Sequence, residues 1–352
     1  MKLTFGGYDH TEHLEQGSLI LRHYGALRSS MKATLLLSAS IPHLPAVGEE
    51  IQITENDEVL WGGILVESEW ECYDQDRARV ALRGQGYEQI LQRYCFPAIS
   101  TGEMTPSATA QYLFETYLHP QDGLCLGEID EGITTKNAYT FYPAKAASVF
   151  DFLAGENGYR WWVDREKKFH MKRTLPRAAL TLSVDLTEQD ENRISDLQTF
   201  VFRDSTAGYR NMQYAYNKSG NVDGIARADT EILTMQSRYG SGEYGAATYS
   251  SVIYSEQDAQ RIAAQVLSES PGTGEVEFST DDGRFSIGQV IGVCAPICGI
   301  EEITNYSVTD IRAVYFYDRF RYTVTARKTD AGALSVPTWE EALAQRNLIE
   351  AR

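Results

Sequence analysis

Two similar stretches decide the fold of this chain: Val47-Gly48-Glu49-Glu50-Ile51-Gln52-Ile53 and Ile287-Gly288-Gln289-Val290-Ile291-Gly292-Val293. In each stretch a glycine precedes a run in which β-branched residues recur at every second position. This alternation is typical of a strand with one buried face. Gly288 follows Gly48 by 240 residues, so the same strand is predicted in both halves of the chain.

Further matches lie around these stretches in the same order. Asp76-Arg77-x-Arg79-Val80-x-Leu82 matches Asp318-Arg319-x-Arg321-Tyr322-x-Val324, and Val66 matches Val308. A weaker match pairs Leu21-Arg22 ahead of Arg28 with Phe202-Arg203 ahead of Arg210. Ordered matches at nearly constant spacing predict an internal repeat. Coincidence between two strand-rich regions is the alternative, because such glycine and Asp-Arg turns are common.

The rest of the chain alternates between strands and helices. Short strand-forming runs fill residues 1–95 and return after Ala179. A hydroxyl cap followed by proline predicts a helix at Thr105-Pro106, a second helix begins near Ala144, and a third follows the cap residue Ser255. We therefore predict a mainly β fold with α+β insertions, in which two similar β-barrel domains are separated by an α+β domain. The predicted boundaries are 1–98 for the first barrel, 99–178 for the α+β domain, 179–218 with 275–330 for the second barrel, 219–274 for its insertion, and 331–352 for a C-terminal helix.

Composition excludes several classes of protein. The chain has 352 residues and a formal net charge of −17, and it contains no block rich in Lys and Arg. A nucleic-acid-binding protein needs such a basic surface, and so does a protein that binds anionic lipid. No apolar run reaches the length of a membrane span, and no signal peptide follows Met1, so we expect synthesis in a cytoplasm without a membrane anchor. The five cysteines are irregularly spaced, which predicts reduced thiols.

Signals for catalysis and cofactors are weak. Phosphate-binding, nucleophile-elbow, zinc-protease and dinucleotide motifs are missing, so we predict no enzymatic activity and no cofactor. Asp9-His10-Thr11-Glu12-His13 could hold a metal, but a solvated cluster near an exposed terminus is the favoured interpretation. The other histidines have no evident Cys or Asp partner in the sequence. Trp161-Trp162 could form a carbohydrate platform, although on a strand at least one of them is expected to pack in the core.

The Asp-Arg steps supply the candidate interface residues. Arginines at every second position lie on one strand face, which is either simply solvated or forms ion pairs at an interface. On the second interpretation the residues are Asp76, Arg77, Arg79, Asp318, Arg319 and Arg321. The C-terminal helix opens at Thr338-x-x-Glu341 and has too few apolar residues to fold alone. We expect it to dock through Trp339, Leu343 and Leu348, with folding back onto the second barrel as the alternative.

The layout resembles the tail hub proteins of bacteriophages and related contractile injection systems. The resemblance covers nearly the whole chain and depends on the order of several loose patterns. They are Val47-Gly48-Glu49-Glu50-Ile51, Trp61-Gly62-Gly63-Ile64, the Asp76-Arg77-x-Arg79 strand ending at Gly84-x-Gly86-Tyr87, the Thr105–Leu118 helix, and Phe150-x-x-Leu-Ala154 with Gly158-Tyr159-x-Trp161-Trp162-Val163-Asp164.

This resemblance implies a structural role at the tail tip of a virion assembled in the host cytoplasm. It implies a homotrimer whose six barrels form a pseudo-hexameric ring between a six-fold tube and three-fold tip components. Implied partners are the tail tube or distal tail protein, the tape-measure protein in the lumen, and a fibre, spike or receptor-binding protein. DNA would pass without specific binding, and the acidic composition agrees with that, although acidity also serves solubility. The alternative function is a tail-tip glycan hydrolase or glycan-binding module.

Overall fold

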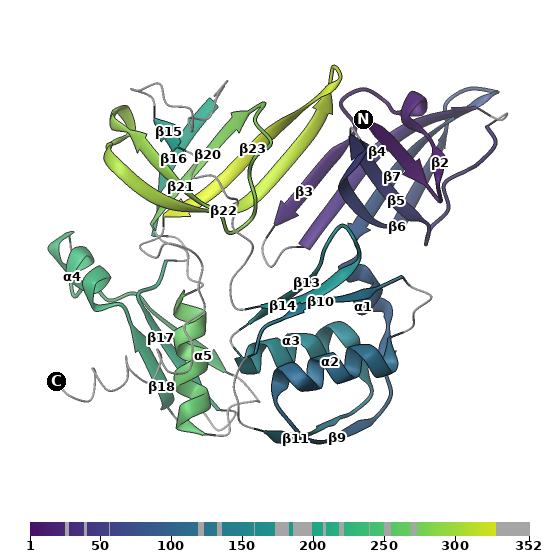
Figure 1. Ribbon diagram of the computed structural model, residues 1–352. Coiled ribbons are helices and arrows are strands. Elements are labelled where there is room, and N and C mark those ends of the chain that lie inside the picture. The colour runs from purple at the N-terminus through teal and green to yellow at the C-terminus, as the bar shows by residue number, and fades with distance from the viewer. Residues whose placement is uncertain are drawn as a thin grey trace.

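The chain folds into four units that are visible in Figure 1, which shows the computed structural model. Two β modules lie side by side, and two units that combine helices with small sheets lie beneath them in this view. We call the latter the helical module (residues 88–172) and the inserted module (residues 212–268). The structure describes residues 1–24, 28–38, 41–55, 57–118, 123–131, 136–157, 159–172, 183–185, 199–206, 209–217, 222–238, 240–249, 255–268 and 273–328.

The first β module is built from strands in which every second side chain is buried. In β4 (Arg28–Ser38), Met31, Ala33, Leu35 and Leu37 are buried and the residues between them are not. One face of the sheet therefore packs on the core while the other faces solvent. The strands pair antiparallel in the order β3-β4-β7-β6-β5-β1-β2. Their bounds are β1 (Lys2–Phe5), β2 (Tyr8–Asp9), β3 (Ile20–Tyr24), β5 (Glu50–Glu55), β6 (Glu58–Cys72) and β7 (Arg77–Gly86), with the 3-10 helix η1 at Thr11–His13.

The second β module repeats this strand order with residues from the other half of the chain. Its strands run β16-β20-β23-β22-β21-β15 where the first module has β3-β4-β7-β6-β5-β1. The sixth strand differs in direction, because β1 is antiparallel to β5 whereas β15 is parallel to β21. The bounds are β15 (Ser183–Asp185), β16 (Thr199–Asp204), β20 (Gly274–Thr280), β21 (Val290–Ala295), β22 (Ile300–Phe316) and β23 (Arg319–Lys328), with the 3-10 helix η3 at Pro296–Cys298.

Residue pairing across the strands confirms the repeat at the level of topology. In the first module the rows of paired residues include Leu21, Met31, Gly84 and Leu65 on four successive strands. The equivalent row in the second module is Phe202, Val276, Ala326 and Val308. Both rows end at an irregularity in the ladder, which lies after Leu65 in β6 and after Val308 in β22. When the two rows are superposed, Asp76 aligns with Asp318 and Leu21-Arg22 aligns with Phe202-Arg203, as predicted.

Gly48 and Gly288 occupy the same turn in the two modules. Their φ angles are +98° and +80°, a region that glycine adopts without strain. The Gly48 N–H donates to the Leu65 carbonyl at 2.8 Å, and the Gly288 N–H donates to the Val308 carbonyl at the same distance. The predicted match of Val66 with Val308 is therefore wrong by one residue. The reason is the length of the following turn. Five residues separate the paired residues Cys72 and Ala78 of the first module, whereas four separate their equivalents Tyr315 and Phe320 in the second.

Two other predictions need correction. Arg28 begins β4, whereas Arg210 precedes β17 of the inserted module, so these two arginines are not equivalent. Neither β module forms a closed barrel within the described residues, because the strand order of each is an open path. The edge strand β3 pairs instead with β22 of the other module, and this joins all the strands of both modules into one sheet of thirteen. Closing a module into a barrel would leave it without unpaired strand edges. Here an edge strand of one module pairs with the other module instead.

The helical module packs two helices on small sheets. Helix α2 (Pro106–Tyr117) begins as predicted: the Thr105 hydroxyl accepts a hydrogen bond from the Ala108 N–H at 3.2 Å, and Pro106 occupies the first turn. Its core includes the rings of Phe114, Phe150 and Phe169. The other elements are α1 (Glu88–Arg93), β8 (Cys95–Phe96), β9 (Ile99–Met104), β10 (Cys125–Ile129), β11 (Asn137–Phe141), β12 (Ala144–Lys145), α3 (Ala146–Asn157), β13 (Arg160–Val163) and β14 (Lys168–Lys172).

The inserted module is a three-stranded sheet covered by helix α5 (Glu256–Ser268). Ser255 directly precedes this helix, as predicted, and Ala259 and Ala263 pack on the alanines of the sheet. The remaining elements are β17 (Met212–Tyr216), β18 (Val222–Arg227), α4 (Asp229–Arg238) and β19 (Gly245–Tyr249). Strand β17 pairs with β18 and β19, so it lies in the insertion and not in the second barrel domain where the sequence boundaries put it.

Trp161 and Trp162 are adjacent on β13 and serve two different cores. Trp161 belongs to the core of the helical module, where its ring lies 6.0 Å from that of Phe169. Trp162 belongs to the core cluster of the second β module and stacks on His170 at 5.1 Å. Since the side chains of a strand alternate, one strand can join the two units. The tryptophans are 9 % and 7 % exposed, so this pair forms no exposed carbohydrate platform.

We expect Trp162→Ala to loosen the second β module from the helical module, and to lower the free energy of unfolding by about 3 kcal/mol because a large buried ring is removed. Hydrogen exchange followed by mass spectrometry should show faster exchange in β14 and β20–β23, with little change in α2 and α3. Trp161→Ala is the matched control and should give faster exchange in α2 and α3. The same exchange pattern in both variants would contradict this assignment.

Candidate assembly interface

The first group of predicted interface residues lies at the turn between β6 and β7. The Arg77 guanidinium contacts the Asp74 carboxylate at 2.6 Å and lies over the Tyr73 ring, and the Asp76 N–H donates to Asp74 at 3.0 Å. The Arg77 guanidinium also donates a hydrogen bond to the Asp74 carboxylate, and this bond lowers the pKa of Asp74. Further along β7, Arg79 contacts Glu15 at 2.8 Å. Both arginines are exposed but already ion-paired within the chain.

The second group occupies the equivalent turn between β22 and β23. Tyr317 and Asp318 both have positive φ, and the Asp318 carboxylate accepts a hydrogen bond from Tyr315 at 3.3 Å. Arg319 and Arg321 both contact Asp281, at 2.8 Å and 3.6 Å. The structure therefore puts the predicted residues at two equivalent hairpins and not in one cluster. Their role at an interface stays a prediction. Trp339, Leu343 and Leu348 lie outside the described residues.

The contact between the two β modules is itself an observed interface, which we call the module seam. It consists of Ile20–Tyr24 of β3 paired antiparallel with residues 310–314 of β22. On the solvent side of the sheet, Arg22 contacts Asp310 at 2.8 Å. On the core side, Ala313 is buried in the core cluster of the first module. The seam thus combines a backbone ladder with an ion pair and apolar burial. No local pattern in the sequence indicates this pairing.

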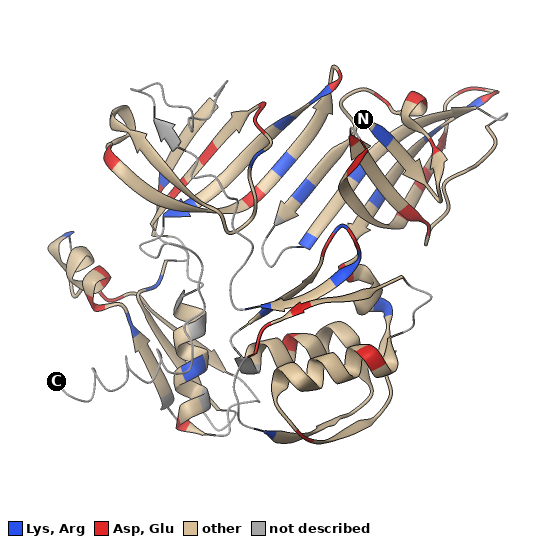
Figure 2. Ribbon diagram, viewed as in Figure 1, with Lys and Arg blue, Asp and Glu red and all other residues tan. Residues whose placement is uncertain are grey.

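The solvent face of the continuous sheet carries both signs of charge. Figure 2 shows basic and acidic positions distributed along the strands of both modules. The basic residues on this face include Arg22, Lys32, Arg79, Arg83, Arg312 and Arg321, and the acidic ones include Glu67, Glu69, Glu71, Asp310, Glu275 and Glu277. The net charge of the whole chain therefore does not describe this face.

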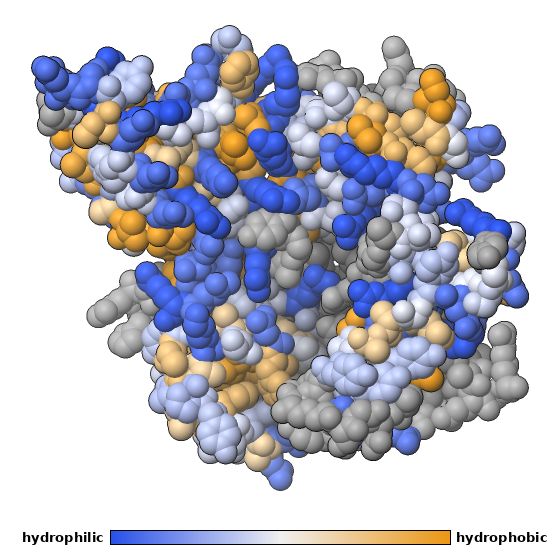
Figure 3. All heavy atoms as spheres, turned by 180° about the vertical axis from the view of Figure 1, so that it is seen from behind, coloured by the Kyte–Doolittle hydropathy of each residue, from blue (hydrophilic) through white to orange (hydrophobic). Residues whose placement is uncertain are grey.

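The opposite view of the molecule shows how apolar groups are distributed. In Figure 3, hydrophilic side chains cover most of the coloured surface, and hydrophobic ones form separate patches over both β modules. Several large apolar side chains are nevertheless exposed at strand ends and edges. They include Trp70, Tyr73, Val201, Phe316 and Tyr317. Tyr73, Phe316 and Tyr317 lie at the two hairpin turns, whereas Trp70 and Val201 lie on strands. Single exposed apolar residues are ordinary on a protein surface.

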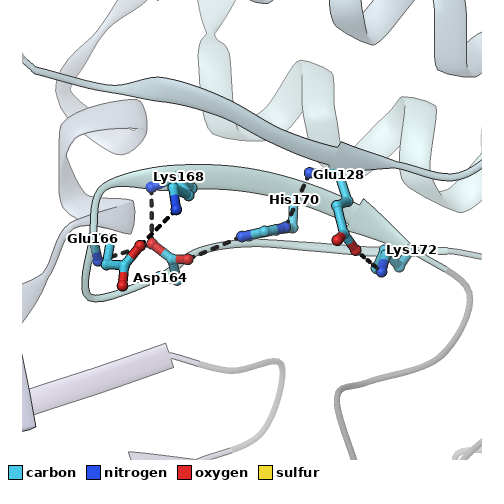
Figure 4. Close-up of polar contacts among 6 residues, drawn as sticks. All are labelled: Glu128, Asp164, Glu166, Lys168, His170 and Lys172. Carbon is cyan, nitrogen blue, oxygen red and sulfur yellow. Dashed lines mark hydrogen bonds and ion pairs between the residues drawn. The ribbon is translucent and has the colours of Figure 1, made fainter.

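His170 lies in a polar network that holds the β13–β14 hairpin (Figure 4). Asp164 accepts from the backbone N–H groups of Glu166 and Lys168, both at 2.9 Å, and its second oxygen lies 3.0 Å from His170 Nε2. His170 Nδ1 accepts from the Glu128 N–H at 3.1 Å, so the ring proton lies on Nε2. Because both ring nitrogens are engaged, this histidine is built to hold the hairpin and not to transfer protons.

The prediction that His170 has no acidic partner is therefore wrong. Asp164 is six residues away in sequence, and the turn between β13 and β14 brings the two side chains together. The sequence carries a signal for this contact, because the charged segment Arg165-Glu166-Lys167 between two strand-forming runs is typical of a hairpin turn. Ion pairs Lys168–Glu166, at 2.6 Å, and Lys172–Glu128 extend the same network.

The Asp9–His13 segment also differs from its favoured interpretation. His10 is 1 % exposed, and its Nε2 lies 3.2 Å from His43 Nδ1, whose ring in turn contacts Glu49 at 3.0 Å. Burial, followed by the nearby His43 and His13, lowers the pKa of His10. Within the described residues no three His, Cys, Asp or Glu side chains are placed to hold a metal ion. This cluster connects the N-terminal strands to the loop before Gly48.

Lys167 connects the helical module to the first β module. Its ammonium contacts Glu50 at 3.0 Å and lies over the Tyr87 ring at 5.2 Å. The Tyr87 hydroxyl donates to the same carboxylate. Burial raises the pKa of Glu50, but the hydrogen bonds from Tyr87 and Lys167 outweigh it, so this pKa lies below its ordinary value. The carboxylate is thus held ionised at the contact between two modules.

Solved structures show where this architecture occurs. The 43 kDa tail protein of prophage MuSo2 from Shewanella oneidensis superposes with a TM-score of 0.68 at 11% identity, over 93% of this chain and 98% of that one. The chain shares its fold with phage tail proteins. A tail protein from Neisseria meningitidis MC58 (TM-score 0.64, 13% identity, 94% of this chain and 96% of that one) and prophage tail protein gp18 from Listeria monocytogenes (0.60, 10%, 100% of both) agree.

These likenesses confirm the resemblance predicted from the sequence, at the level of the fold. Sequence comparison alone does not reach them, since no protein-family model and no curated protein matches the chain. The three solved relatives are described as tail proteins. No helix in the described part of the chain has the length and apolar character needed to cross a membrane.

We expect Glu50→Gln to lower the free energy of unfolding by about 1 kcal/mol at neutral pH, because the ionised carboxylate loses its charge-assisted hydrogen bonds. A lowered pKa in the folded state stabilises the protein above the ordinary carboxyl pKa, and this stabilisation is lost as the pH falls through the folded pKa. The difference between variant and parent, measured by urea unfolding, should therefore shrink toward about pH 3. Glu58→Gln, at an exposed position, is the control. An equal loss at both pH values would contradict the assignment.

We expect Asp164→Ala to destabilise the β13–β14 hairpin by about 2 kcal/mol, since it leaves three donors without their acceptor. Glu166→Ala removes only an exposed ion pair and should cost well under about 1 kcal/mol. Nitrogen-15 NMR of the imidazole should find His170 protonated at Nε2 and not at Nδ1 at high pH. A proton on Nδ1, or equal losses for the two variants, would show that the network does not hold the hairpin.

Proposed function

We propose that this chain is a structural hub protein of a phage tail or a related injection machine. Three copies form a ring of six β modules, which adapts a six-fold tail tube to three-fold components at the tip. The observation that carries the proposal is the repeat of one strand order in two modules joined by the module seam. The shared fold of the tail proteins supports it.

The symmetry argument follows from the repeat. Two modules of the same topology in one chain present two similar surfaces to a neighbour above. Three such chains offer six similar positions to a six-fold tube while the ring itself keeps three-fold symmetry. Components below the ring can then bind in three copies. A chain with one β module would need six copies and would give no three-fold surface.

Passage of DNA and of a tape-measure protein through the ring is part of the same proposal. The net charge of −17 opposes tight binding of nucleic acid. Arginines on the sheet face are also paired with carboxylates, as in Arg22 with Asp310 and Arg79 with Glu15. A paired guanidinium releases fewer phosphate counterions than a free one, so DNA would meet a surface with few uncompensated cations.

The proposed partners are the tail tube or distal tail protein on one side and a fibre, spike or receptor-binding protein on the other. We propose the C-terminal segment, with Trp339 as its anchor, as the attachment point for the distal component. The site of action is the tail tip of a virion assembled in the host cytoplasm. The role is structural, and no cofactor is proposed.

Light scattering of the purified full-length chain at high concentration should give three times the mass of one chain. Electron microscopy of the same sample should show rings with six lobes, because each copy supplies two β modules. The control is the chain diluted below the association range, which should give the mass of a single copy. A dimer or a hexamer as the largest defined species would contradict the proposal.

A further inference from the structure

The module seam has two halves, and each half has an equivalent elsewhere in the chain. In the seam, the outer edge of β3 pairs with residues 310–314 of β22. The repeat aligns β3 with β16, because Leu21 and Phe202 occupy the same row. It also aligns Leu65 of β6 with Val308 of β22, so residues 67–71 of β6 correspond to residues 310–314. Both parts of a second seam are therefore present.

The two parts of this second seam cannot meet within one chain. In the described part of the chain, β16 ends the thirteen-stranded sheet and pairs only with β20. Residues 67–71 of β6 pair with β7 along one edge, and β5 reaches only as far as Ile64 along the other. Figure 1 shows β16 and β6 on opposite sides of the two β modules. Among the residues that the structure describes, no strand pairs with either edge where its equivalent in the seam is occupied.

The ion pair of the seam has an equivalent on these edges. Arg22 and Asp310 form the ion pair of the seam, and their equivalents are Arg203 and Glu67. The cation and the carboxylate are thus retained although the residues belong to different modules. Both lie on the solvent face of the sheet, where Arg203 contacts Glu277 at 3.1 Å and Glu67 contacts Arg83 at 3.6 Å. Pairing of the two edges would add a contact to each without removing one.

The apolar side chains match as well. Ala313 of the seam is 4% exposed, and its equivalent Trp70 is 44% exposed. Val201 of β16, the equivalent of Ile20, is 40% exposed. An unpaired strand edge that exposes large apolar side chains is a template for pairing with another chain. Both edges therefore have the character of strands that are covered in the assembled protein.

We infer that β16 of one copy pairs with residues 67–71 of β6 of a second copy, in the register of the module seam. The paired residues are Ser68 with Asp204, Glu69 with Arg203, Trp70 with Phe202, and Glu71 with Val201. The contact is head-to-tail, so it closes into a ring or continues as a filament. The inference rests on the proposed ring and adds the surface and register through which its copies join.

Paired cysteines test the register. In a Cys72→Ser background, which removes a neighbouring exposed thiol, Glu71→Cys with Val201→Cys should form disulfides between copies under mild oxidation. Ser68→Cys with Asp204→Cys tests the register at a second position. Directly opposed residues in an antiparallel pair have Cα atoms about 4.5–5.5 Å apart, within disulfide range. Glu67→Cys with Val201→Cys is the matched control, because the two positions are offset by four residues, or about 13 Å along the strands.

Gel electrophoresis without reductant reads the result, and light scattering of each variant confirms that it still folds and associates. Cross-linked dimers and trimers from the two in-register variants, at least tenfold more abundant than in the control, would support the inference. Trimers without cross-links, or with equal cross-linking in the control, would overturn it and leave the proposed function standing. A chain that stays monomeric and uncross-linked at high concentration would overturn both.

Discussion

Backbone hydrogen bonds between β3 and β22 join the two β modules into one sheet, and the rest of the architecture depends on this ladder. A strand edge that is left open exposes a row of donors and acceptors, and it must be covered or paired. Here the first module covers the edge of the second. The relative orientation of the modules is consequently set by the geometry of paired strands. A backbone ladder restricts this orientation more than side-chain contacts between two surfaces would.

The helical module reinforces the same arrangement from beneath. Lys167 contacts Glu50 of the first β module, and Trp162 packs into the core of the second. These two residues belong to one short hairpin, which is itself held by Asp164 and His170. One rigid hairpin therefore touches both modules that the ladder joins. A change in the angle between the modules would have to break either the ion pair or the packing of the tryptophan.

The titratable groups that first suggested chemistry serve structure instead. Asp164 and His170 close a turn, and Glu49 and His43 position the buried ring of His10. His170 and His43 each engage both ring nitrogens within the chain, and the arginines of the hairpins are paired with carboxylates. Side chains whose polar atoms are engaged in this way suit a protein that holds a fixed shape.

The local elements and the repeat could be predicted from the amino-acid sequence. Thr105-Pro106 and Ser255 predicted helix starts, because a cap satisfies backbone groups within the first turn of the helix. The alternation of apolar and polar residues predicted strands, because successive side chains of a strand point to opposite faces. The bulge after Leu65, the open modules, and the pairing of Arg22 with Asp310 across 288 residues became evident only from the three-dimensional fold. These features depend on which edges meet in space, and no local pattern records the partner of a strand edge.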